Sequence, residues 1–85
     1  MELIKLPTFT DYMKAVQKAR YNGQITHTQL IILRICYKAR VKQEPKHFNY
    51  FQKATSQSKE DTKWELKDLA ERGAIHMVRP DFYML

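Results

Sequence analysis

No part of the sequence limits the possible folds as strongly as the almost unbroken apolar segment over residues 30–36. Thr26 and Gln29, which precede it, are spaced as a capping box, in which the two side chains bond the free backbone groups of a first helical turn. The pattern predicts a helix over residues 27–40. A helix that is apolar around much of its circumference is usually enclosed by other elements, so we expect this helix to be the centre of the core.

Apolar residues at helical spacing predict three more helices, over residues 11–21, 46–55 and 58–72. Gly23 and Gly73 follow the first and the last of them, where glycine readily adopts the left-handed conformation that ends a helix. The expected inner faces consist of Phe9, Tyr12, Met13 and Val16, then of Phe48, Phe51 and Ala54, and finally of Thr62, Leu66, Leu69 and Ala70.

The last part of the chain predicts a β-hairpin. Short extended segments at residues 74–78 and 82–85 flank a turn at Pro80, and proline is favoured early in a β-turn. Thr8 or Thr10 is the expected N-cap of the first helix, and Ser58 that of the last. The fold class expected is therefore mainly α-helical with a small β-hairpin.

Length and composition restrict the chain to one globular domain. Eighty-five residues suffice for one hydrophobic core, so residues 1–85 are expected to form a single domain. The chain is 44% hydrophobic and 28% charged, which is a globular rather than a disordered balance. No apolar run approaches the ~20 residues of a membrane span, so neither a membrane partner nor a signal peptide is expected. The single cysteine, Cys36, excludes an intrachain disulfide and fits a cytoplasmic location.

Catalytic chemistry is not expected from this sequence. His27, His47 and His76 stand far apart, and with one cysteine they form no metal-ligand cluster. The sequence has no paired-carboxylate motif and no glycine-rich phosphate loop. We therefore expect a protein that is not an enzyme and that has no metal or cofactor. Cys36 is expected to be a small core residue, and His47 and His76 are expected to be surface residues without a special role.

Two stretches of the sequence resemble the winged helix-turn-helix superfamily, and within it the MarR-like regulators. Residues 25–33, ITHTQLIIL, are similar to the family's T-x-x-Q opening before an apolar helix, and residues 66–75, LKDLAERGAI, are similar to its passage from recognition helix into wing. The resemblance covers about residues 8–85. It implies three to four helices with a C-terminal two-stranded wing, and a recognition helix at residues 58–72 that enters the major groove of duplex DNA.

The resemblance also implies which side chains contact DNA. They are Gln57, Ser58, Lys59, Lys63, Trp64 and Lys67 in the recognition helix and at its entry, and Arg79 at the tip of the wing. The three lysines recur every four residues and share one helix face. Such a face suits phosphate or base contacts or, equally, a solvated surface with paired charges. Trp64 is expected to be at least partly exposed, either in an interface or folded against the wing or the third helix.

A second basic segment points to a polyanionic partner. The net charge of the chain is +6, and it is divided into +7 for residues 1–57 and −1 for residues 58–85. Residues 34–53 alone carry +5, with aromatic residues interleaved, which suits nucleic acid. The segment adds Lys42, Lys46 and Lys53 as candidate DNA contacts. The alternative is that its aromatic residues belong to the core and its cations only keep the domain in solution.

Two functions are compatible with these patterns. The first is a small winged-helix protein that binds duplex DNA as a transcriptional regulator or as an accessory factor of a mobile element. The second is a protein-interaction module on the same fold, for example a phage- or plasmid-encoded adaptor or inhibitor, with Trp64, Glu60, Glu65 and Asp68 as its docking face. The flanking helices through which MarR-like regulators dimerise are not found, so a monomer or a weak homodimer is expected.

Overall fold

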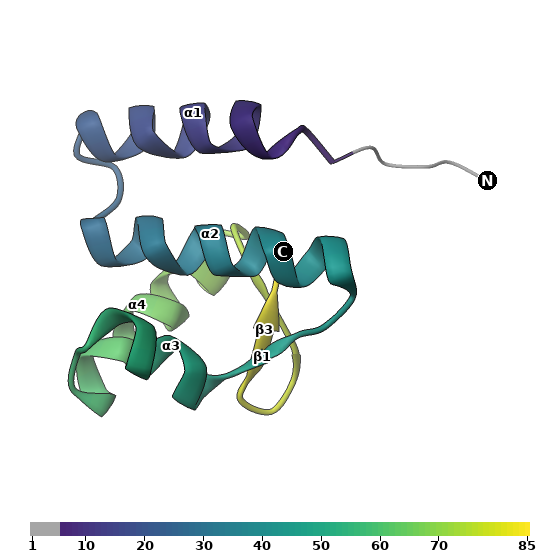
Figure 1. The fold of residues 1–85 in the computed structure, drawn as a ribbon. Coiled ribbons are helices and arrows are strands. Elements are labelled where there is room, and N and C mark those ends of the chain that lie inside the picture. The colour runs from purple at the N-terminus through teal and green to yellow at the C-terminus, as the bar shows by residue number, and fades with distance from the viewer. Residues whose placement is uncertain (1–5) are drawn as a thin grey trace.

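The computed structural model describes residues 6–85, in which four helices pack with a small antiparallel sheet (Figure 1). In chain order the elements are α1 (Phe9–Tyr21), α2 (His27–Lys42), β1 (Lys46–His47), α3 (Phe48–Thr55), α4 (Lys59–Glu71), β2 (His76–Arg79) and β3 (Phe82–Met84). The strand order is β1-β3-β2. The mainly helical fold class is confirmed, and none of the described helices is long and apolar enough to cross a bilayer. Residues 1–5 lie outside the described residues. The structure therefore does not test whether they belong to the expected domain, or the expectation that they do not begin a signal peptide.

The helices begin and end at residues whose side chains favour those positions. Thr8 and Ser58 are the N-caps of α1 and α4, and each hydroxyl accepts a hydrogen bond from the backbone N–H three residues later. The capping box of α2 is complete, because Thr26 accepts from the Gln29 N–H and the Gln29 side chain accepts from the Thr26 N–H. Gly73 follows α4 with a φ of 77°, a conformation that costs glycine little.

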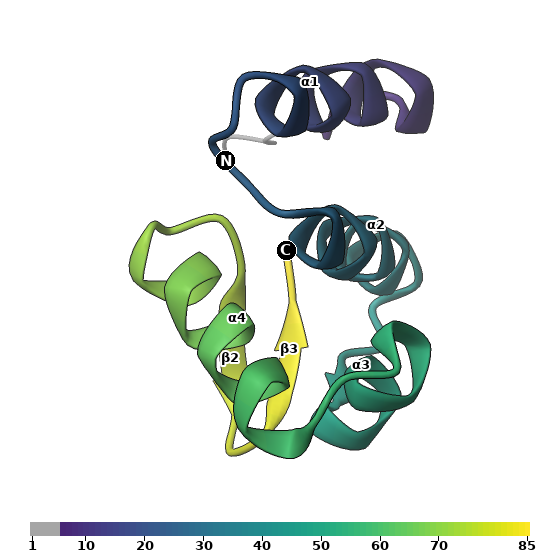
Figure 2. The same ribbon diagram turned by 90° about the vertical axis from the view of Figure 1, so that its left-hand side faces the viewer.

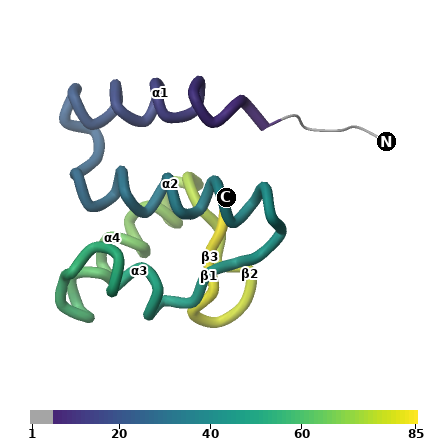
Figure 3. Tube along the Cα trace, in the orientation of Figure 1, coloured from purple at the N-terminus to yellow at the C-terminus, as the bar shows by residue number. Residues whose placement is uncertain are grey.

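The central element of the core is α2, as its apolar sequence predicts. It contacts α1, α3, α4 and β3, and Ile32 and Cys36 on it have no solvent exposure. In Figure 3, α1 and α2 run antiparallel beside each other, and Figure 2 shows α3 and α4 on opposite sides of β3. Phe51, Leu66 and Ile75 complete the buried cluster between these layers. The helix α4 is therefore held by α2, α3 and the sheet, and its remaining side is exposed.

The predicted third helix begins two residues too early. Lys46 and His47 form β1, which pairs with β3, so the sheet has three strands and the prediction of a two-stranded hairpin is incomplete. The helix α3 begins only at Phe48. His47 is also its N-cap, since its Nδ1 atom accepts a hydrogen bond from the Asn49 N–H at 3.0 Å. The expectation that His47 has no special role is therefore wrong.

Smaller differences concern other boundaries and the inner faces. The helix α2 runs to Lys42 rather than to residue 40, and it ends at Gln43, which has a left-handed φ of 57°. The strand β2 begins at His76 rather than at residue 74. Ala54, expected on the inner face of α3, is exposed because it lies at an opening between α3 and α2. Phe9, expected on the inner face of α1, is 37% exposed because it lies at the margin of the helix pair, where it packs edge-on against Tyr37 and beneath Arg34 and Lys38.

Burial makes the single cysteine chemically inert in the folded protein. Cys36 has no solvent exposure, and burial raises the pKa of its thiol to about 12. Burial, with the nearby Cys36 as a smaller cause, also raises the pKa of Tyr12 to about 12. Nucleophilic attack requires the thiolate. Cys36 is thus a core residue, as predicted.

These raised pKa values predict a loss of stability in alkali. The unfolded chain releases the Cys36 proton near pH 9 and the folded chain only near pH 12, so ionisation favours the unfolded state as the pH rises between these values. The free energy of unfolding should fall by about 1 kcal/mol between pH 9 and pH 10 from this thiol. Urea unfolding at the two pH values measures the loss. Cys36→Ala is the control and should lose less, and equal losses in both proteins would contradict the assignment.

Candidate nucleic-acid interface

The candidate interface is built on α4, whose inner side fixes its orientation. Thr62, Leu66 and Leu69 are buried there, as predicted. Glu65 is also buried, at 7% exposure, and its Oε2 atom accepts a hydrogen bond from the Thr26 hydroxyl at 2.5 Å. A buried carboxylate needs such a partner. The residue that caps α2 therefore also holds the middle of α4.

A second set of polar contacts extends this attachment to the end of α4. The Gln29 amide donates to Asp68 Oδ2 at 2.7 Å, and Arg72 forms an ion pair with the same carboxylate at 2.9 Å. Arg72 also donates to the Gln24 carbonyl, before α2. Glu65 and Asp68 are thus engaged with α2 and its entry. The expectation that Glu65 belongs to an outer docking face is wrong, because burial beside Leu66 turns its carboxylate inward, whereas Asp68 stays partly exposed and lines the same depression as Trp64.

The outer side of α4 carries two stripes of different character. Lys59, Lys63 and Lys67 are exposed one turn apart and form what we call the lysine stripe. Trp64, 61% exposed, lies beside it in a shallow depression that Lys67, Asp68 and Glu71 also line. The exposure predicted for Trp64 is confirmed. The lysine stripe lies on the sheet side of α4, since Lys63 and Lys67 line a hollow of about 320 Å³ together with Met77 and Tyr83 of the hairpin.

The turn of the hairpin and the start of α3 meet the lysine stripe. The Phe48 N–H donates to the Asp81 carbonyl at 2.7 Å, which ties α3 to the turn. Lys63 Nζ lies 5.9 Å from the centre of the Phe48 ring. On the sheet, Arg79 Cζ lies 4.0 Å from the centre of the Phe82 ring, which the His47 ring also contacts edge-on. Two of the predicted DNA contacts, Lys63 and Arg79, therefore both lie near the start of α3.

Gln57 and Ser58, at the entry to α4, have structural roles. The Gln57 amide donates to the Thr28 hydroxyl at 3.1 Å, which links the α3–α4 connection to the first turn of α2. The Ser58 hydroxyl accepts from the Asp61 N–H at 3.1 Å as the N-cap. The Gln57 Oε1 atom is buried without a hydrogen-bond partner among the described residues. DNA contact by these two residues stays a prediction, but their side chains already serve the fold.

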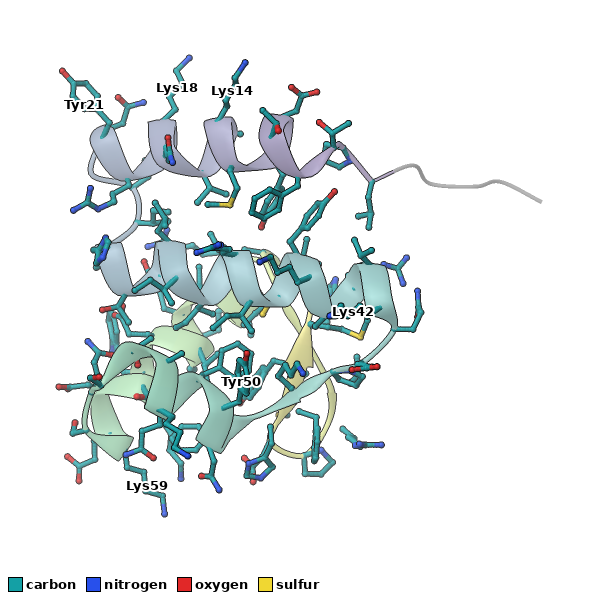
Figure 4. All side chains as sticks on the ribbon, viewed as in Figure 1. Lys14, Lys18, Tyr21, Lys42, Tyr50 and Lys59 are labelled. Atoms are coloured by element: carbon teal, nitrogen blue, oxygen red, sulfur yellow. The ribbon has the colours of Figure 1, made fainter. Side chains whose placement is uncertain are left out.

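Three further predicted contacts lie away from the lysine stripe. Lys42 and Lys46 line a groove between α2 and α3, and Lys53 lines a different depression on α3 that Gln57 also borders. Figure 4 shows Lys42 near the end of α2 and Lys59 far from it, at the start of α4. The structure thus divides the predicted basic residues among the lysine stripe, the groove between α2 and α3 and the depression at Lys53, rather than gathering them into one surface.

Within residues 6–85, no three His, Cys, Asp or Glu side chains are arranged to hold a metal ion. The chain matches no protein-family model, no curated protein and no solved structure. The geometry of the lysine stripe, the hairpin turn and the start of α3 is therefore the basis for a functional proposal.

The sequence did carry signals for two features of this site that were missed. A histidine directly before an apolar helix start, as at His47, can act as an N-cap through a ring nitrogen. Glu65 lies three residues after Thr62 and one before Leu66, so helical spacing places it between two buried positions. Both assignments depend on knowing which side of each helix is covered.

Proposed function

We propose that the protein is a winged-helix domain that binds duplex DNA, as a transcriptional regulator or an accessory factor of a mobile element. The order of elements from α2 to β3 and the strand order β1-β3-β2 support a winged-helix arrangement with the β2–β3 turn as a short wing. In such an arrangement α4 enters the major groove, and the adjacent elements contact the backbone.

The observation that carries the proposal is that Lys63 and Arg79, from α4 and from β2, both lie near the start of α3. Neither cation forms an ion pair with another residue in the described part of the chain, and the same holds for Lys59 and Lys67. Unpaired cations on one surface can neutralise successive phosphates, which supplies most of the affinity of non-specific DNA binding.

The acidic residues of α4 indicate how the helix is oriented on DNA. Glu60 and Asp61 are exposed at its first turn, where they favour the helix dipole but repel phosphate. Glu60 precedes Trp64 by one turn and Lys67 by two turns, so it lies at the border between the lysine stripe and the tryptophan. Contact is therefore proposed through the lysine stripe and the hairpin turn, with Glu60 and Trp64 at the edge of the contact.

The proposal predicts strong dependence of affinity on salt. If Lys59, Lys63, Lys67 and Arg79 each neutralise one phosphate, the logarithm of the binding constant should fall with a slope of about −3.6 against the logarithm of the salt concentration. Affinity would then drop roughly 100-fold between 50 and 200 mM salt. Fluorescence anisotropy with labelled duplexes of mixed sequence measures this slope. Absence of binding at low salt, where the electrostatic attraction is largest, would contradict the proposal that the protein binds duplex DNA.

A second candidate function is docking to a protein through Trp64. The observation that favours it is the large exposed area of this side chain, since exposed tryptophans are enriched at the centres of protein interfaces. Without the buried Glu65, the docking face would consist of Trp64, Glu60 and Asp68, and Glu71 lines the same depression. Trp64→Ala separates the two functions, because it should leave DNA affinity unchanged and abolish docking to a partner protein.

A further inference from the structure

A groove between α2 and α3 lies apart from the lysine stripe and has about 360 Å³ of volume. Its floor is apolar and includes Ile31, Ile35 and Ala39 of α2. Its rim carries four cations, which are Arg34, Lys38, Lys42 and Lys46. We call it the basic groove. Figure 4 shows Tyr50 of α3 on one wall and Lys42 at the end of α2.

The positive charge of the basic groove is not balanced within the described residues. Glu44 is the acidic residue among those that line it, and none of the four cations forms an ion pair with another residue of the described part of the chain. Arg34 and Lys38 lie instead over the Phe9 ring, at 5.9 and 5.4 Å from its centre, and Lys46 lies 4.9 Å from the centre of the Tyr50 ring. The rim therefore favours an anionic ligand.

Another hollow lies beside the basic groove, between α1 and the end of α2. This second hollow of about 340 Å³ is lined by Phe9 and Val41, and it shares Lys38 and Lys42 with the basic groove. The distance along α2 from Ile31 to Lys42 is about 16 Å, at 1.5 Å per residue. Val41 and Tyr50 at its borders are 58% and 50% exposed. A ligand that fills both the basic groove and the second hollow must therefore be elongated. It must also carry apolar groups for the apolar lining and acidic groups for the cations.

We propose that the basic groove binds an acidic amphipathic segment of a partner protein, whose apolar side chains enter the floor while its carboxylates pair with the rim. An amphipathic helix in an apolar groove is a common mode of peptide recognition. Duplex DNA fits this surface poorly, because phosphates gain nothing from an apolar floor and a concave surface cannot enter a DNA groove. A compact small anion would leave the second hollow empty.

The test uses a labelled acidic helical peptide of three to four turns, with leucine and phenylalanine at positions i, i+3, i+4 and i+7. The control is a scrambled peptide of the same composition, which keeps the charge and loses the apolar face. Anisotropy titrations with the full chain should show at least tenfold tighter binding of the ordered peptide. Equal binding of both peptides would reduce the groove to a non-specific basic surface and overturn the proposal.

Variants of the protein locate the binding site. We expect two variants to weaken binding of the ordered peptide at least tenfold. One is Lys38→Glu with Lys42→Glu, and the other is Ala54→Gln at the exposed edge of the groove. Lys14→Glu with Lys18→Glu is the matched control for charge, because both lysines point outward from α1 (Figure 4), and it should change affinity less than twofold. Circular dichroism checks that every variant is folded. Equal losses in the two charge-reversed pairs would contradict a defined site.

Two further outcomes of these experiments would show that the basic groove binds duplex DNA or a second copy of the chain rather than an acidic segment of a partner protein. In the first outcome, charge reversal at Lys38 and Lys42 weakens binding of duplex DNA as much as binding of the peptide, and DNA displaces the peptide. The groove is then part of a nucleic-acid-binding surface and the proposal fails. If the protein self-associates through the groove and excludes the peptide, a second copy is the occupant and the proposal also fails. Loss of peptide binding with unchanged DNA binding supports it, and this readout does not depend on whether α4 binds DNA.

Discussion

Removing three cations from the proposed DNA-binding surface should weaken binding to duplex DNA roughly 1,000-fold at 50 mM salt. The variant is Lys59→Gln, Lys63→Gln and Arg79→Gln. Each phosphate contact contributes about tenfold at this salt concentration through counterion release. These side chains lie on α4 and on the hairpin turn, and two of them border the start of α3. The salt slope should fall by about 2.7 at the same time.

The control for this experiment has the same charge on a different surface. Lys14→Gln, Lys18→Gln and Arg20→Gln remove three exposed cations from α1 and lower the net charge equally. This variant should bind DNA within about threefold of the unmodified chain at 50 mM salt, since only long-range attraction is lost. Similar losses in both variants would show that net charge alone attracts the DNA. The lysine stripe would then not be the interface.

Replacing Phe51 with alanine should lower the free energy of unfolding by about 3–5 kcal/mol. Phe51 has no solvent exposure, and its ring packs edge-on against Tyr83 at a centroid distance of 5.9 Å. A chain of this length has a total stability of about 4–13 kcal/mol, so the variant will be largely unfolded at the lower end of this range. Urea unfolding followed by circular dichroism measures the loss.

Tyr50→Ala is the matched control for this prediction. Tyr50 precedes Phe51 in α3 but is 50% exposed, and its contacts include Lys46 Nζ at 4.9 Å from the ring centre. The substitution should cost about 1 kcal/mol or less. A cost for Phe51→Ala as small as that for Tyr50→Ala would mean that α3 is not anchored in the core, and the described position of the basic groove would be wrong.

Much of the fold follows from local chemistry in the sequence. The caps at Thr8, Thr26 and Ser58 use hydroxyls that are adjacent to the groups they bond, and the glycine after α4 has the conformation that only glycine adopts easily. The central place of α2 follows from its apolar circumference. The strand β1 could not be predicted in this way, because its two residues are extended only through pairing with β3, 35 or more residues later in the chain.

The candidate site was predicted less well for the same reason. The exposure of Trp64 depends on its own helix and could be predicted, whereas the inward turn of Glu65 depends on Thr26, which lies 39 residues earlier. The basic segment 34–53 was expected to act together with the lysines of α4. Lys42 in α2 and Lys46 in β1 instead line the basic groove. Their position depends on the direction of these two elements, which is set by tertiary packing.

The hydrogen bond from the Phe48 N–H to the Asp81 carbonyl joins two surfaces that would otherwise be independent. Its donor begins α3, which forms one wall of the basic groove, and its acceptor lies in the turn beside Arg79. A ligand that displaces α3 must therefore either stretch this bond or carry the turn with it. Any cooperativity that results is reciprocal by thermodynamic necessity, so DNA would alter the affinity of the groove by the same factor as the groove's ligand alters that of DNA.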